Sequence, residues 1–168
     1  MGSRIEHRAE FAADVASTYA AVAGEEALRA RLEEIGGHSA ALLAYEVSDT
    51  GLRYQLRQGI SADKLPQAVR TLHKGDLLVT RTQTWRVSND GTGHQGNASV
   101  EVGGVPGEIN ARTALLANDG RTVHRTSGEV TVRIPLFGGK LESVIAEQVT
   151  KLLEREAEFT AKWLTEAN

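Results

Sequence analysis

The chain lacks cysteine altogether, and aromatic side chains make up only 5% of its 168 residues. The absence of cysteine excludes disulfides, thiolate nucleophiles and cysteine-ligated zinc. The low aromatic content argues against a platform on which nucleic-acid bases would stack. Long hydrophobic runs are missing as well, because every apolar stretch is far shorter than the roughly 18 residues that a membrane span requires. We therefore expect no integral membrane association.

An excess of one charge is also missing, since 19 lysine and arginine residues face 22 aspartate and glutamate residues. Without a basic block, nucleic acid is not expected as a partner. The N-terminus has no apolar signal-peptide core, which predicts a cytoplasmic protein. Hydrophobic residues make up 40% and charged residues 24%, as is typical of a folded globular chain. This length and composition predict a single domain over residues 1–168.

In the N-terminal part of the chain, apolar residues recur first at every second position and then at helical spacing. Apolar residues at every second position from Ile5 to Phe11 predict a strand with one buried face. Asp14 is a predicted N-cap for a helix that starts at Val15. Gly24 interrupts this helix, and residues 25–35 predict a second short one.

Turn residues divide the middle of the chain into strands. Residues 41–47 and 52–56 predict a hairpin in which Leu43 and Val47 share a face with Tyr45. Further strands are predicted over 77–87, 96–102, 109–117 and 122–134, and Asn-Asp-Gly turns join some of them. Because short hairpin connections join strands of opposite direction, we expect a curved antiparallel sheet of about seven strands.

The C-terminal segment predicts one long helix. Apolar residues recur at helical spacing from Leu141 to Trp163, with no glycine or proline between them. A helix of about 25 residues spans about 37 Å and can cover one face of the sheet. Pro135 is expected to end the last strand, and Glu142 is expected in the first helical turn. The predicted fold class is therefore α+β, with two short helices after the first strand and a long C-terminal helix across the sheet.

This element order resembles the START-like superfamily, also called SRPBCC or helix-grip. The superfamily includes birch-pollen-allergen-like proteins, polyketide cyclases and aromatases, and lipid-transfer domains. Several segments resemble more specifically an actinobacterial family of uncharacterised proteins within it. They are Arg4-Ile5-Glu6-His7, Ala9-Glu10-Phe11, Gly75-Asp76-Leu77 with Trp85, residues 134–142, and Glu158-Phe159-Thr160 with Trp163-Leu164. The resemblance implies a cavity between sheet and helix that binds a lipid or another apolar molecule, and it assigns no catalytic residues.

Several side chains on the predicted inward faces of the strands are candidates for lining this cavity. They are His7, Arg81, Gln83, Trp85 and His124. A buried Arg81 needs a carboxylate or a ligand anion, unless its strand end reaches solvent or a bulge reverses the alternation. The two inward histidines are either hydrogen-bonded core residues or ligand contacts. The remaining histidines, His38, His73 and His94, fall in predicted loops.

The long helix adds three more candidates. Glu156 lies near the middle of the apolar stripe, with Gln148 and Thr160 at its margins. One interpretation places Glu156 at the cavity, paired with Arg81 or His7. The other lets the last helical turns overhang the sheet, so that the carboxylate stays in water.

Three functions remain open at this point. The first is the binding or transport of a hydrophobic or amphipathic small molecule, lipid-like or polyketide-like, in a cavity of a few hundred Å³. The alternative is a cyclase/aromatase- or hydrolase-like enzyme that uses a cavity His/Arg pair. The third is a domain that acts only through a protein partner and whose cavity is filled by its own side chains. The histidine spacing matches no metal-ligand pattern, so no metal or cofactor is expected, and the chain is expected to be a monomer or a homodimer.

Overall fold

The fold is described from a computed structural model, which covers residues 2–37, 39–64, 67–72 and 74–166. The strands are β1 (Ser3–Phe11), β2 (Ala41–Ser48), β3 (Gly51–Ile60), β4 (Leu77–Val87), β5 (His94–Val102), β6 (Gly107–Asn118) and β7 (Arg121–Val132). The helices are α1 (Val15–Ala23), α2 (Glu25–Ile35), α3 (Gln67–Leu72) and α4 (Gly138–Glu166), with a short 3-10 turn over Ala62–Lys64. The predicted element order is confirmed, whereas His38 and His73 lie outside the described residues.

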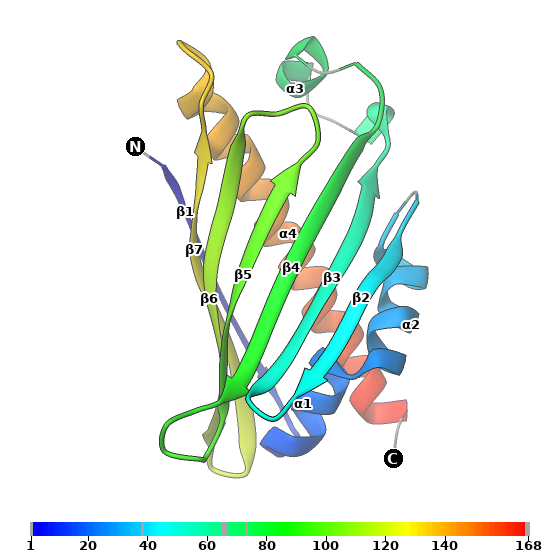
Figure 1. Cartoon of the computed structure of the whole chain (residues 1–168), viewed down its shortest axis with the longest axis vertical. Helices are drawn as coiled ribbons and strands as arrows, with labels where there is room; N and C mark the ends of the chain where they lie inside the picture. The colour runs from blue at the N-terminus through cyan, green and yellow to red at the C-terminus, as the bar shows by residue number, and fades with distance from the viewer. Residues whose placement is uncertain (1, 38, 65–66, 73, 167–168) are drawn as a thin grey trace.

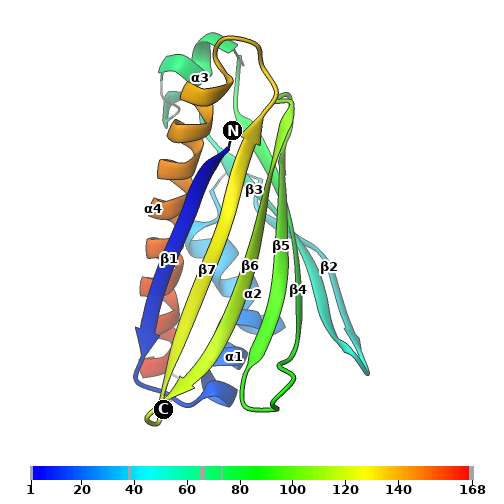
Figure 2. The ribbon, with the colours of Figure 1, turned by 90° about the vertical axis from the view of Figure 1, so that its left-hand side faces the viewer.

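The seven strands form one antiparallel sheet in the order β1-β7-β6-β5-β4-β3-β2. Strands β2 to β7 follow one another in the sheet, and β1 departs from chain order by pairing with β7 (Figure 1). This register places Ala9 opposite His124 and His7 opposite Thr126. Figure 2 shows that α4 then runs along the same side of the sheet as α1 and α2. The predicted α+β fold class, with a long C-terminal helix across an antiparallel sheet, is confirmed.

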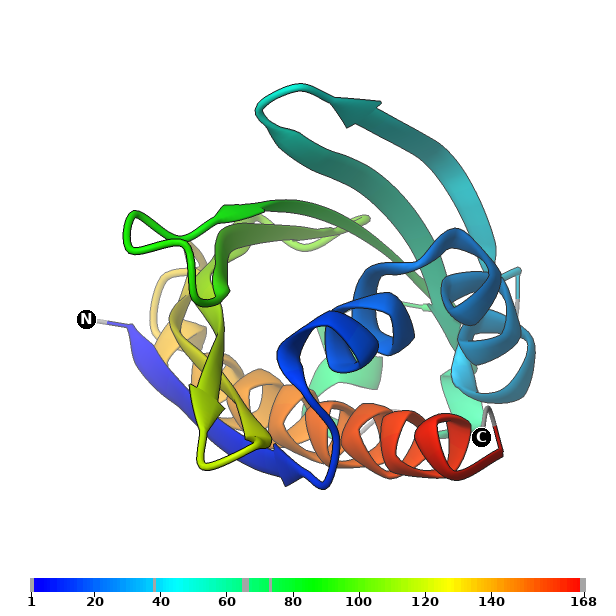
Figure 3. The same ribbon diagram turned by 90° about the horizontal axis from the view of Figure 1, so that it is seen from below.

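The sheet curves around its inward face, as the end-on view of Figure 3 shows. The register places small residues at the centre of this face, where Ala98 lies opposite both Gln83 and Ala111. A Cβ atom at Gly96 would lie 1.8 Å from the carbonyl oxygen of Thr84, so the close approach of β4 and β5 requires glycine there. The small central residues leave room for large side chains from the neighbouring strands.

Two hydrophobic clusters make up the core on the inward face. The first lies under the beginning and middle of α4 and consists of Ile5, Leu77, Ile109, Val130, Val132, Leu141, Ala146 and Leu153. The second lies under α1 and α2 and consists of Val22, Ala23, Leu28, Leu32, Leu52, Tyr54, Leu56, Trp85 and Leu115. Each large side chain among them contributes about 1.5–3 kcal/mol by leaving water. No helix in the described ranges is both long enough and apolar enough to cross a membrane.

Helix α4 begins earlier than predicted, at Gly138, and β7 ends at Val132. Glu142 therefore lies beyond the first turn of α4, and the prediction that its charge serves that turn is wrong. Its side chain is buried instead, and the carboxylate accepts a 2.8 Å hydrogen bond from the backbone N–H of Val132. This bond ties the end of β7 to the start of α4.

The hairpin of β2 and β3 forms as predicted, but a bulge interrupts β2 between Leu42 and Ala44. The extra residue shifts the alternation of side chains, so Leu42 packs against the core and Leu43 points outward, 44% exposed. Val47 is 75% exposed near the tip of the hairpin. The prediction that Leu43 shares a face with Tyr45 is therefore wrong, whereas Val47 keeps that face opposite Leu52 and is exposed by its place at the hairpin tip.

Candidate functional site

Polar and charged side chains converge on one space between the sheet and α4. It is lined by His7, Val22, Arg31, Tyr54, Arg81, Gln83, Trp85, Thr113, His124, Leu153, Glu156, Ala157 and Thr160. The space lies between the two hydrophobic clusters, because Leu153 belongs to the first cluster and Tyr54 to the second. The candidates from the sequence are therefore brought together here, with the exception of Gln148, which is exposed on α4.

The free volume of this space is about 20 Å³, enough for about one water molecule. A few hundred Å³ were expected for a binding protein, and the expectation of an open cavity is wrong. An interior filled by side chains is what the third hypothesis expected. Helix α4 packs on β1, β7, α1 and α2, whereas its backbone stays farther from the middle strands of the sheet. Long side chains fill the space between α4 and the middle strands. Among them are Arg31, Tyr54, Arg81 and Trp85. The interior is thus closed by side chains and not by backbone.

Glu156 and Arg81 form an ion pair across this space. Nη1 of Arg81 donates to both carboxylate oxygens of Glu156, at 3.0 and 2.8 Å. The side chains are 14% and 8% exposed, so the interpretation that left Glu156 in water is wrong and the pairing with Arg81 is confirmed. Burial opposes the ionisation of Glu156, but the charges of Arg31 and Arg81 outweigh it and lower its pKa to about 2.

Arg31 of α2 is a further charged member of the site, and sequence reasoning missed it. Its side chain is 5% exposed, and its Nε lies 3.8 Å from Oε2 of Glu156. A long hydrogen bond of 3.5 Å joins its Nη1 to the carbonyl of Val22. Nε and Nη2 have no hydrogen-bond partner within the described ranges. The signal was present in the sequence, because Arg31 follows Ala27 and Leu28 at helical spacing and so shares their buried face.

Two histidines line the space and a third lies outside it. His7 is half-buried on β1, and His124 lies diagonally across from it on β7, opposite Ala9. Burial lowers the pKa of His124 to about 4 against the attraction of Glu156, so its imidazole is neutral at pH 7. Its Nε2 is buried without a hydrogen-bond partner in the described part of the chain. His94 was predicted in a loop, but it begins β5 and stacks on Tyr19 with ring centroids 3.8 Å apart.

Gln83 and Trp85 form a fixed part of the wall. The amide nitrogen of Gln83 donates to the hydroxyl of Thr113 at 3.0 Å and to the carbonyl of Thr84 at 2.8 Å. The indole N–H of Trp85 donates to the hydroxyl of Tyr54 at 3.4 Å. These donors are already bound within the wall, whereas Nε and Nη2 of Arg31 and Nε2 of His124 have no hydrogen-bond partner in the described ranges.

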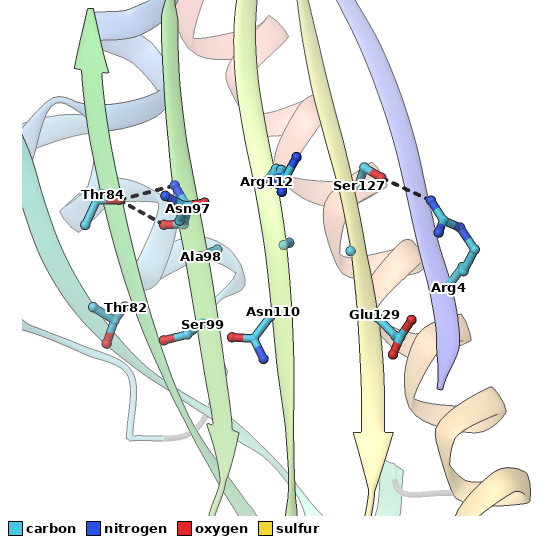
Figure 4. A pocket seen from close by; sticks show the side chains of 12 residues that line it. Arg4, Thr82, Thr84, Asn97, Ala98, Ser99, Asn110, Arg112, Ser127 and Glu129 are labelled. Atoms are coloured by element: carbon cyan, nitrogen blue, oxygen red, sulfur yellow. Dashed lines mark hydrogen bonds between the residues drawn. The ribbon is translucent and has the colours of Figure 1, made fainter. Parts of the chain in front are cut away.

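A larger hollow, of about 710 Å³, lies on the opposite, outward face of the sheet (Figure 4). Its lining is polar and spans β4, β5, β6, β7 and β1, with Arg112, Asn110 and Glu129 among the side chains (Figure 4). Most of these side chains reach solvent, and they bond to one another, as in the contact of Arg4 with Ser127. The buried charges lie on the inward face, and we therefore place the candidate site there.

Comparison with known proteins agrees with this architecture. A family model described as a protein of unknown function (DUF2505) matches residues 6–164. An uncharacterised protein of Mycobacterium tuberculosis is 32% identical over 170 residues, which cover 95% of this chain and 88% of the relative. Norcoclaurine synthase from Thalictrum flavum has a similar structure, with a TM-score of 0.60 at 14% identity over 99% of this chain and 88% of that one. A START superfamily protein from Mycobacterium smegmatis gives a TM-score of 0.56 at 13% identity over 98% and 99% of the two chains. The fold is therefore START-like.

Proposed function

The chain belongs to the DUF2505 family of proteins of unknown function, and we propose that it binds a hydrophobic or amphipathic small molecule between the sheet and α4. The observation that carries this proposal is the buried charged site formed by Arg31, Arg81, Glu156 and His124 between the two hydrophobic clusters. The same fold in a START superfamily protein is consistent with such an internal site.

The buried charges are costly for stability alone. Removing an ionic group from water costs several kcal/mol, and replacing a buried ion pair by apolar side chains is often neutral or stabilising. Here Arg31 keeps unsatisfied N–H groups, and His124 keeps an unsatisfied ring nitrogen, within the described ranges. Buried polar groups without hydrogen-bond partners are often found at functional sites. A ligand that satisfies them would return part of this cost on binding.

An apolar gap next to the polar site suits the rest of an amphipathic ligand. It has a volume of about 10 Å³ and lies between β5, β6, β7 and α4, with Val100, Ile109, Val130 and Ile145 in its wall. Val100 lies directly opposite Arg81 in the sheet, so the polar site and the apolar gap meet at this pair of residues. A hydrocarbon chain entering the gap would gain about 0.8 kcal/mol per buried methylene.

Binding requires the interior to expand, because both gaps are small. The structure allows this through side chains. Arg31 and Arg81 have several rotatable bonds, and the backbone of α4 stays away from the middle strands. Rotamer changes at binding sites are common even where the backbone moves little. We therefore expect the ligand to displace long side chains while the sheet and α4 keep their places.

Native mass spectrometry of protein purified from the organism that makes it tests this proposal. A stoichiometric small molecule is expected on the wild-type protein and is expected to be lost in Ala157→Leu, which fills the polar site. Ala161→Leu is the matched control, because Ala161 lies one turn later on the exposed side of α4. Circular dichroism checks that both variants fold. Retention of the molecule by folded Ala157→Leu would contradict an interior site.

A cyclase-like or hydrolase-like enzyme is the second candidate, and one observation favours it. His7, His124 and Arg81 line the same space, so a general base and a cation lie on one site. A neutral His124 is able to accept a proton, although its low pKa makes it a weak base. The discriminating test follows the recovered molecule over time with wild-type protein and with His124→Gln. Conversion by the wild type alone supports an enzyme, and an unchanged molecule supports binding.

A further inference from the structure

Arg31 has one edge of its guanidinium buried without a hydrogen-bond partner in the described ranges. The side chain is 5% exposed and lies on the wall of the polar site. Its Nη1 reaches the carbonyl of Val22, whereas Nε and Nη2 have no hydrogen-bond partner in the described part of the chain. In a guanidinium these two nitrogens form one side, and their N–H groups point in parallel. This is the geometry that binds the two oxygens of a carboxylate.

The charges around the site do not balance. Arg31 and Arg81 are cationic, and Glu156 is the carboxylate that faces both. The other titratable groups lining the space are His7 of β1, Tyr54 of β3 and His124 of β7, of which His124 is neutral at pH 7. Two arginines against one carboxylate leave the site with one positive charge in excess. An unpaired buried charge is among the least favourable features of a protein interior.

We propose that the site binds the carboxylate head group of an amphipathic ligand, and that the Nε and Nη2 groups of Arg31 hold it. This inference rests on the proposed function and names its ligand class. The added carboxylate brings the site to two cations and two anions. Both oxygens of Glu156 already accept from Arg81, and Glu156 lies 3.8 Å from Nε of Arg31, which leaves that guanidinium edge unbonded.

The position of the polar site indicates where the hydrocarbon chain of the ligand lies. Arg81 lies opposite Val100, and from there Ile109 and Val130 continue the same row across β6 and β7. This row leads under the first half of α4, where Ile145 closes the apolar gap. A monocarboxylate with a flexible hydrocarbon chain satisfies both parts of the interior, and a neutral alcohol of equal length satisfies the apolar part alone.

Isothermal titration calorimetry with decanoate and with decan-1-ol separates the head group from the chain. The wild-type protein is expected to bind decanoate at least about tenfold more tightly than the alcohol, which is about 1.4 kcal/mol. Arg31→Met keeps the apolar stem and removes the charge, so it is expected to bind both molecules alike. Arg29→Met is the matched control, because Arg29 lies on the same helix with its side chain 60% exposed. It is expected to bind as the wild type does.

A second measurement separates ligand binding from a structural role of Arg31. Arg31→Met keeps the hydrogen-bonded pair of Glu156 and Arg81. It removes the more distant cation, 3.8 Å from Glu156, together with its unsatisfied Nε and Nη2 groups. These two effects oppose each other, so the free energy of unfolding in urea is expected to stay close to that of the wild type. A loss of stability would mean that Arg31 supports the fold, and it would overturn the assignment.

The outcomes are distinct. Equal binding of decanoate and the alcohol by the wild type, or unchanged decanoate binding by Arg31→Met, overturns the head-group inference and leaves the proposed function standing. If neither molecule binds to the wild-type protein, the proposed binding of single-chain amphiphiles falls together with the inference.

Discussion

Replacing Glu156 by glutamine tests the buried charge cluster most severely. Glutamine keeps the shape of the side chain and one acceptor oxygen, but it removes the only carboxylate that faces both arginines in the lining of the site. Arg81 then loses the charge at the end of its 2.8 Å and 3.0 Å hydrogen bonds. Removing one partner of a buried ion pair typically costs about 3–5 kcal/mol. This is a large share of a total stability of about 5–15 kcal/mol.

Urea unfolding followed by tryptophan fluorescence measures this loss. With a denaturant slope of about 2 kcal/mol per M, a loss of about 4 kcal/mol moves the midpoint down by about 2 M. Glu147→Gln is the matched control on the same helix, because Glu147 pairs with Lys151 at 3.4 Å with its side chain 66% exposed. Such a surface pair contributes under about 0.5 kcal/mol.

The urea midpoints of Glu156→Gln and Glu147→Gln are compared to test whether Glu156 stabilises the buried arginines. If Glu156→Gln moves the midpoint no further than Glu147→Gln, the arginines are not held by Glu156, and the account of a costly buried cluster is refuted. The triple replacement Arg31→Met, Arg81→Met, Glu156→Leu extends the test. It is expected to be near the wild type in stability or above it, since it removes every charge of the cluster together.

Three further predictions concern the pH response and the frame of the site. The pKa of His124 is lowered from 6.5 to about 4, so the unfolded chain binds this proton first and stability is expected to fall as the pH decreases from 6.5 to about 4. A pH series of urea unfolding should show a smaller slope for His124→Gln, and an identical slope would contradict the burial of His124. Glu142→Ala leaves the buried N–H of Val132 without its acceptor and is expected to lower the free energy of unfolding by about 1–3 kcal/mol, with Glu142→Gln losing less. Gly96→Ala places a Cβ atom against the backbone of β4 and is expected to cost about 1–3 kcal/mol in thermal unfolding, so a neutral result would refute the close approach of the strands.

Much of the fold was predictable because periodicity is a local property. The alternation from Ile5 to Phe11 and the helical stripe from Leu141 to Trp163 each identify an element without knowledge of its neighbours. The exact buried face depends on those neighbours, however. Helical spacing from Leu141 places Leu152 on the stripe, whereas in the structure Leu153 belongs to the core and Leu152 is half-buried. The bulge at Leu43 likewise depends on how β2 and β3 pair and leaves no sign in the alternation itself.

Most of the side chains that line the site could be proposed from the sequence, but the small free volume of the site could not. Inward position on a strand or on the helix stripe made His7, Arg81 and Glu156 candidates for one space, and of the two alternatives left open for Glu156 the structure has the pairing with Arg81. Arg31 was missed because an arginine between apolar residues of a short helix is usually read as reaching solvent. The free volume was overestimated because it depends on the rotamers of long side chains, which periodicity does not determine.

A crystal structure of the protein with saturating decanoate tests the central claim most directly. We predict the molecule between the sheet and α4, with its carboxylate within hydrogen-bond distance of Arg31 and its chain beside Ile109, Val130 and Ile145. The side chain of Arg81 or Arg31 is expected to have moved to make room, with the sheet unchanged. An interior that stays as closed as the present one, with decanoate bound only in the hollow on the outward face, would contradict the account.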